Sequence, residues 1–225
     1  MIITIDGPMA SGKSTTAYRL AHELTFFYLN SGFLFRGLAY AILKISHHFG
    51  RSQFDVNAVD FIGLLPRLSY ANDASSGARI LFDHVDITSE LKDPEVATLA
   101  SMLGTDLEVR SALAVWQQEL VRGKDSIVEG RDAGSVVFAD AEAKIFLTAR
   151  PEIRAARWQR EQAARGNNIS FQEALEAVNT RDERDSNRKI APLIVPQGAI
   201  IIDNSELSLN ETMAEIKKQI NILQD

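Results

Sequence analysis

The sequence contains no cysteine among its 225 residues, which excludes disulfide bonds, thiolate metal sites and a cysteine nucleophile. It also lacks any apolar run near the roughly 20 residues that a membrane-spanning helix requires, so we expect no membrane partner. Sequence repeats and low-complexity tracts are absent as well. The first residues pass directly into a β-branched run, without the basic segment and apolar core of a secretory signal, and we therefore expect a cytoplasmic protein.

Acidic residues are in excess, with 30 against 24 lysines and arginines, which gives a net charge of −6. This balance argues against a nucleic-acid polymer as a partner. Arginine is nevertheless concentrated between residues 150 and 188, where it would either bind small anions or lie on solvated helix faces. The hydrophobic content of 45% is ordinary for a globular chain, and the length suits one domain with a small insertion.

Residues 7–14, GPMASGKS, fit the pattern G-x-x-x-x-G-K-[ST] of a phosphate-binding loop. A short β-branched run, residues 2–5, precedes the loop, and residues 15–24 after it carry apolar side chains at helical spacing. The alternative interpretation is a glycine-rich turn with a chance Lys-Ser pair. Because a strand precedes the pattern and a helix follows it, we expect the loop to bind a nucleoside triphosphate.

The residue types of this loop indicate how it would hold ATP. Gly7 and Gly12 let backbone N–H groups approach phosphate oxygens, and the following helix adds the positive end of its dipole. Lys13 is expected to be an exposed point charge for the outer phosphates, while the Ser14 hydroxyl would complete the coordination shell of Mg²⁺. The predicted ATP-binding residues of the loop are Gly7, Ala10, Ser11, Gly12, Lys13, Ser14 and Thr15.

Strand-like and helix-like segments alternate along most of the chain, which is typical of an α/β fold with a parallel sheet and helices on both faces. Strands are expected near residues 2–5, 26–29, 126–128, 144–148 and 199–203. Helices are expected near residues 15–24, 38–45, 58–65, 94–103, 107–122, 151–165, 170–187 and 209–223. Residues 66–88 differ, because three short β-like runs separated by turn residues predict a small antiparallel insertion.

Several polar clusters follow strands of this sheet or lie on its later helices, so they belong to the edge where such folds bind ligands. Each could instead be an exposed residue or a local ion pair. Together they would supply the cations that phosphoryl transfer needs. The clusters are Ser31 with Arg36, residues 130–135, Arg154 with Arg157 three residues apart, and Arg181, Asp185 and Arg188 on one helix face.

Three motifs are found in order along the chain: ITIDGP at residues 3–8 before the loop lysine, G-R-D-x-G at residues 130–134, and R-D-x-x-D-x-x-R at residues 181–188. With them the chain resembles the bacterial cytidylate (CMP) kinases, nucleoside monophosphate kinases with a phosphate-binding loop. The resemblance covers nearly the whole chain. It implies phosphoryl transfer from ATP to CMP or dCMP, with Mg²⁺ as cofactor, in pyrimidine metabolism.

The resemblance also implies an organisation and a set of site residues. One kinase domain would span residues 1–225, with an acceptor-binding region at 32–125 that includes the β insertion, and a lid with arginine-rich helices at 150–190. A monomer is expected. The implied catalytic residues are Lys13, Arg131 and Arg188, and Arg154 and Arg157 of the lid would join the ATP site. The implied acceptor-binding residues are Ser31, Arg36, Ser101, Arg110, Arg131, Asp132, Arg181 and Asp185.

Within that set, the resemblance implies that Ser101, Arg110 and Asp132 face the cytosine edge, while Arg181 and Asp185 hold the sugar. Three positions depart from the family pattern, which usually has Asp at Asn30, Tyr at Phe35 and Arg at Lys92. Phenylalanine lacks a hydroxyl for the acceptor phosphate, and lysine cannot make the bidentate contact of arginine.

Two alternatives to a CMP kinase remain open at this point. One is a kinase for another small acceptor, such as a different nucleoside monophosphate. The other is a degenerate kinase kept as a nucleotide-binding module, against which the retained lysine, serine and arginines count. A GTPase switch would require an Asn-Lys-x-Asp motif, which the sequence lacks.

Overall fold

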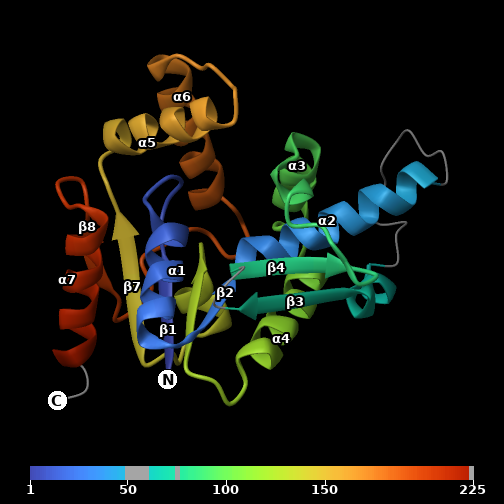
Figure 1. Cartoon of the computed structure of the whole chain (residues 1–225), viewed down its shortest axis with the longest axis horizontal. Helices are drawn as coiled ribbons and strands as arrows, with labels where there is room; N and C mark the ends of the chain where they lie inside the picture. Colours follow the sequence, from blue (N-terminus) through green and yellow to red (C-terminus); the bar gives the residue numbers. More distant parts are fainter. Residues whose placement is uncertain (49–60, 74–76, 223–225) are drawn as a thin grey trace. The chain divides into compact units, whose positions relative to one another are not determined.

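The computed structural model describes residues 1–48, 61–73 and 77–222 (Figure 1). The first residues of the helix expected at 58–65 lie outside this part of the chain. The chain divides into two compact units, one made of Met1–Phe27 with Lys124–Asp225 and the other of Tyr28–Gly123. The single kinase domain and its acceptor and lid regions stay predictions.

The larger sheet has five strands in the order β2-β6-β1-β7-β8. These strands are β1 (Ile2–Asp6), β2 (Phe27–Asn30), β6 (Ser126–Gly130), β7 (Ala143–Thr148) and β8 (Ile200–Asp203). Within the first unit β1 pairs in parallel with β6 and β7, and β7 pairs in parallel with β8. Ile3 and Ile5 on one face of β1 and Thr4 and Asp6 on the other are all completely buried, so the strand is covered on both faces, as its β-branched run predicts. The predicted parallel sheet is confirmed.

Helices of the first unit begin at residues that the sequence marks clearly. Pro151 occupies the first position of its helix, where a missing N–H costs nothing. Ser170 and Glu173 form a reciprocal capping box. In Figure 1, α5 and α6 lie beyond the arrowhead of β7, at the strand ends where ligands are expected. The helices are α1 (Lys13–Leu24), α5 (Pro151–Ala164), α6 (Phe171–Ser186) and α7 (Leu209–Ile222), with a π-helical turn, η4 (Ala133–Val137).

The second unit contains the predicted insertion, where β4 pairs in antiparallel fashion with both β3 and β5. Helix α2 packs on this small sheet, because a Cβ atom at Gly37 would lie only 2.8 Å from Cγ2 of the buried Ile80. The elements are α2 (Ser31–His48), η2 (Ile62–Arg67), β3 (Leu68–Asp73), β4 (Gly77–Phe82), β5 (Val85–Asp86), η3 (Glu90–Lys92), α3 (Pro94–Leu103) and α4 (Leu107–Val121). The antiparallel insertion is confirmed.

The start of α2 differs from the sequence-based prediction, which placed the helix after Arg36. The helix begins at Ser31, directly after β2. The reason is a cap, because Oδ1 of Asn30 accepts the backbone N–H of Phe33 at 3.2 Å. Ser31 and Arg36 therefore lie on the first turns of a helix and not in a loop.

Asp6, the last residue of β1, holds the start of η4 against the end of this strand. Its two carboxylate oxygens accept the backbone N–H groups of Ala133 at 2.9 Å and Gly134 at 2.7 Å. A Cβ atom at Gly134 would lie 2.5 Å from Oγ1 of Thr4, so only glycine allows this approach. Burial raises the pKa of Asp6 to about 6, although the two N–H groups act in the opposite direction.

This raised pKa gives a pH-dependent stability. The folded protein binds the Asp6 proton more tightly than the unfolded chain does, so the contribution is fully present below about pH 4 and is lost as pH rises through about 6. We expect the unfolding free energy of the wild type minus that of Asp6→Asn to fall by about 2 kcal/mol between pH 4.5 and pH 7.5. Urea unfolding of both proteins across this range measures it. A difference that does not vary with pH contradicts the raised pKa.

Candidate nucleotide-binding site

The phosphate-binding loop connects β1 to α1 and depends on two glycines. A Cβ atom at Gly7 would lie 2.0 Å from the carbonyl oxygen of Leu147 on β7, so the loop can leave the sheet here only without a side chain. Gly12 adopts φ +91°, and Ala10 lies in the left-handed region at φ +56°. Left-handed residues among right-handed ones turn successive backbone N–H groups toward one side, as in backbone sites that bind anions.

Lys13 is buried at 5% exposure, so the expectation of an exposed point charge was wrong. Its Nζ donates to the carbonyl oxygen of Pro8 at 2.6 Å and to Oγ of Ser11 at 3.4 Å. The side chain thus folds over its own loop, where desolvation first and the positive charge of Arg131 second lower its pKa well below the ordinary value. An anion bound in the loop would therefore strongly favour the charged form of Lys13.

Ser14 has a partner that the sequence analysis missed. Its Oγ donates to Oε1 of Glu129 at 2.7 Å, and Glu129 is buried at the end of β6. Among the described residues no group of three or more His, Asp or Glu side chains forms a metal site. The residues fit Mg²⁺ nonetheless, because Mg²⁺ at nucleotide sites takes one or two protein oxygens and completes its shell with phosphates and water.

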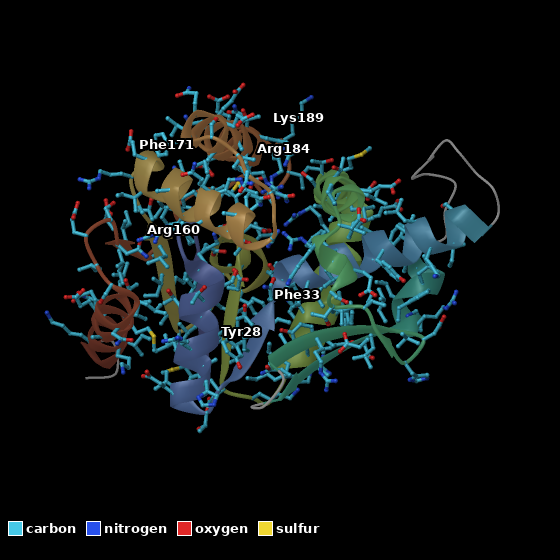
Figure 2. All side chains as sticks on the ribbon, turned by 45° about the horizontal axis from the view of Figure 1, so that its top comes forward. Tyr28, Phe33, Arg160, Phe171, Arg184 and Lys189 are labelled. Carbon is cyan, nitrogen blue, oxygen red and sulfur yellow. The ribbon has the colours of Figure 1, made fainter. Side chains whose placement is uncertain are left out.

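The arginine-rich stretch separates into buried and exposed members. Arg160 on α5, labelled in Figure 2, is exposed, as is Arg165 directly after this helix, and both side chains are solvated. Arg154 is buried at 5% exposure. Its Nε donates to the carbonyl oxygen of Ala149 at 2.8 Å and its Nη1 to that of Met9 at 3.1 Å. Arg157, the other arginine predicted for the lid, also reaches the loop.

Arg157 and Asn204 together contact the loop at Ser11. Nη1 of Arg157 donates to the carbonyl oxygen of Ser11 at 3.4 Å and to Oδ1 of Asn204 at 2.9 Å. Asn204 also donates from Nδ2 to the same carbonyl oxygen at 2.9 Å. Asn204 is not among the residues predicted from the sequence, where its one signal is its place directly after the last strand.

A buried carboxylate gathers three of the predicted arginines. Asp185 on α6, with a side chain 2% exposed, contacts Nε of Arg131 at 3.0 Å and Nε of Arg181 at 3.2 Å, and Nη2 of Arg188 lies 3.3 Å away. Burial alone would raise the pKa of Asp185, but the three arginines hold it below the ordinary value. The first unit thus brings Arg131, Arg181, Asp185 and Arg188 into one cluster.

The remaining predicted acceptor residues have the following places. Asp132, buried at 8% exposure, precedes η4 in the first unit. Arg110 is buried on α4 of the second unit, where its Nη1 donates to the carbonyl oxygen of Gly104 at 3.2 Å. Its guanidinium carbon lies 5.8 Å from the ring centre of Phe35, within the range of a cation–π contact. Ser31 and Arg36 on α2 and Ser101 on α3 are partly exposed.

Comparison with known proteins gives a consistent result. The cytidylate kinase family profile matches residues 3–222. A cytidylate kinase of Chlamydia muridarum is 40% identical over 218 residues, which cover 96% of this chain and 96% of that protein. Another, from Caldanaerobacter subterraneus subsp. tengcongensis, is 34% identical over 218 residues, covering 97% of this chain and 93% of that protein.

A solved structure also matches the fold. It is that of an uncharacterized protein from Eubacterium ventriosum, with a TM-score of 0.56 and 12% identity over 98% of each chain. Likeness at this identity concerns the fold alone. The match of the sequence to a family profile over almost its entire length, with relatives at 34–40% identity, goes further: this chain belongs to the cytidylate kinase family.

Proposed function

We propose that this protein is an ATP-dependent nucleoside monophosphate kinase, which transfers the terminal phosphoryl group of ATP to CMP or dCMP and releases ADP and CDP or dCDP. The observation that carries the proposal is the phosphate-binding loop, with its buried lysine, in a chain of the cytidylate kinase family. Four further cations, Arg131, Arg154, Arg157 and Arg188, belong to the same unit as this loop.

On the donor side, the loop N–H groups and Lys13 bind the phosphates of ATP, and Arg154 and Arg157 add positive charge from α5. Mg²⁺, when bound, neutralises charge on the phosphates. Ser14 would hold the ion, and Glu129 orients the Ser14 hydroxyl by accepting its hydrogen bond at 2.7 Å. Because Glu129 is itself buried, this hydroxyl keeps one orientation, which favours a fixed geometry at the metal.

On the acceptor side, a phosphate oxygen of CMP attacks the terminal phosphorus of ATP, and ADP leaves. This oxygen is already anionic near neutral pH, so the reaction requires cations and alignment more than a general base. Arg131 and Arg188 supply the charge at the transferring group, and Asp185 fixes their guanidinium groups. We assign Ser31 and Arg36 to the acceptor phosphate, Arg181 and Asp185 to the sugar, and Ser101, Arg110 and Asp132 to selection of the base.

We further propose that the enzyme acts as a monomer in the cytoplasm, without a nucleic-acid or membrane partner. The acidic excess supports the absence of a nucleic-acid partner, and a chain without cysteine suits a reducing compartment. Among the described helices, none combines the length and the hydrophobicity that crossing a bilayer demands.

The proposal is tested by measuring ADP release with CMP, dCMP, UMP and AMP as parallel acceptors. We expect the cytidine nucleotides to support the highest kcat/KM. A preference for UMP or AMP would identify a kinase for a different acceptor. ATP binding without turnover on any acceptor would identify a nucleotide-binding module.

Lys13→Ala should lower kcat by about 10²–10³-fold, because the lysine stabilises charge on the transferring phosphoryl group. Stability should change little, since burial already disfavours the charged amine. Lys218→Ala, at an exposed position on α7, is the matched control and should retain full activity. Steady-state kinetics at saturating ATP decide the point, and near-normal turnover of Lys13→Ala removes the loop lysine from the mechanism.

Asp132→Ala should raise KM for CMP far more than KM for ATP. Base recognition by paired donors and acceptors discriminates strongly, because removing one partner leaves the others unpaired. Both Michaelis constants are measured with the other substrate saturating. Equal changes in the two constants would assign Asp132 to the metal or to the structure of η4.

Phe35→Tyr tests the departure from the family pattern. If the missing hydroxyl costs a hydrogen bond to a charged phosphate, restoring it should lower KM for CMP by roughly ten- to a hundredfold with KM for ATP little changed. The Phe35 ring lies 5.8 Å from the Arg110 guanidinium, which is the competing role for this side chain. No gain in acceptor affinity would mean that this packing compensates for the hydroxyl.

A further inference from the structure

Asp182 on α6 joins two groups that are far from it in sequence. Its Oδ1 accepts the backbone N–H of Met9 at 3.0 Å, and its Oδ2 forms an ion pair with Nη1 of Arg154. Nη1 of Arg154 also donates to the carbonyl oxygen of Met9 at 3.1 Å. Met9, in the middle of the phosphate-binding loop, is therefore held through both its N–H and its C=O.

The contacts with Met9 and Asp182, together with one to Ala149, determine the orientation of the Arg154 guanidinium. Its Nε donates to the carbonyl oxygen of Ala149, and its Nη1 is shared between Met9 and Asp182. Within the part of the chain that the structure describes, Nη2 donates no hydrogen bond. Two N–H groups of a nearly buried guanidinium are thus left for the oxygens of a ligand, in a side chain that three partners prevent from rotating.

Electrostatics favours the same arrangement. A guanidinium removed from water is costly without a compensating charge, and the Asp182 carboxylate provides it, since the side chains of Arg154 and Asp182 are 6% and 19% exposed. The charge of Asp182 also opposes the lowering of the Lys13 pKa by burial and by Arg131. A cavity of about 500 Å³ opens at Met9, and its other lining residues include Thr180, Arg181 and Arg184 of α6; Arg184 is labelled in Figure 2.

An ion pair that only joined α5 to α6 would not require the loop. Here the carboxylate and the guanidinium each bond to Met9, one at its N–H and the other at its C=O. Rotation of either peptide group at Met9 would break one of these bonds. The pair therefore restrains the loop backbone as well as the two helices.

We propose that Asp182 is a positioning residue of the donor site, which holds Arg154 and the Met9 peptide groups in the orientation that receives the phosphates of ATP. This inference rests on the proposed function, because it presumes that the loop binds ATP. Asp182 acts through Arg154 and the loop backbone and does not itself touch the nucleotide.

Two substitutions separate the charge of Asp182 from its hydrogen bond. Asp182→Asn keeps an oxygen for the Met9 N–H and removes the charge, whereas Asp182→Ala removes both. Calorimetric titration with a non-hydrolysable ATP analogue and Mg²⁺ should give a dissociation constant about three- to tenfold higher for Asp182→Asn and about ten- to a hundredfold higher for Asp182→Ala. Titration with CMP alone should change by less than twofold.

The controls address folding and coupling. Glu183→Gln, at the exposed neighbouring position on α6, should match the wild type with both ligands. In an Arg154→Ala background, Asp182→Asn should alter analogue affinity by less than twofold, because the group through which the charge acts is gone.

Each other outcome overturns the inference. Equal losses for the analogue and CMP would make Asp182 a residue of general structural importance, and unchanged analogue affinity would make the pair irrelevant to the donor. Tighter analogue binding by Asp182→Asn would mean that Asp182 competes with phosphate for Arg154. If the wild type bound CMP but no analogue, the donor half of the proposed function would fail and this inference with it, whereas the preceding outcomes leave the proposed function intact.

Discussion

Concentrated positive charge is the constraint on which this structure depends. A phosphoryl-transfer site requires several cations close together, yet like charges repel and removing each of them from water costs free energy. Asp185 meets this requirement for Arg131, Arg181 and Arg188 with a side chain that is 2% exposed. Asp182 does the same for Arg154. The acidic residues of R-D-x-x-D-x-x-R therefore make its arginines compatible with a folded protein.

The backbone around the loop obeys a comparable constraint of space. Gly7 passes so close to β7 that any side chain would overlap the carbonyl of Leu147, and Gly134 has no room for a methyl group beside Thr4. Asp6 then joins the end of β1 to the N–H groups at the start of η4. The loop and the segment carrying Arg131 and Asp132 are thereby fixed to the same strand, which limits how far they can move apart.

Local patterns predicted the elements well, because a strand, a glycine loop and a capped helix are each encoded over a few neighbouring residues. The parallel sheet, the antiparallel insertion and the placing of Arg181, Asp185 and Arg188 on one helix face follow from such patterns. The partners of the loop do not. Glu129, Asp182 and Asn204 reach it across 115, 173 and 193 residues of sequence. The burial of Lys13 likewise depends on where its own loop folds, which spacing along the chain does not specify.

The three departures from the family pattern have a common location. Asn30, Phe35 and Lys92 all belong to the unit formed by Tyr28–Gly123, whereas every residue assigned to the donor lies in the other unit. Two of the three have structural roles, since Asn30 caps α2 and Phe35 faces Arg110. Substitutions confined to this unit can alter how an acceptor is held while leaving the packing of the phosphate-binding loop unchanged. In this chain a change of acceptor preference would therefore require no change in the residues that we propose to bind ATP.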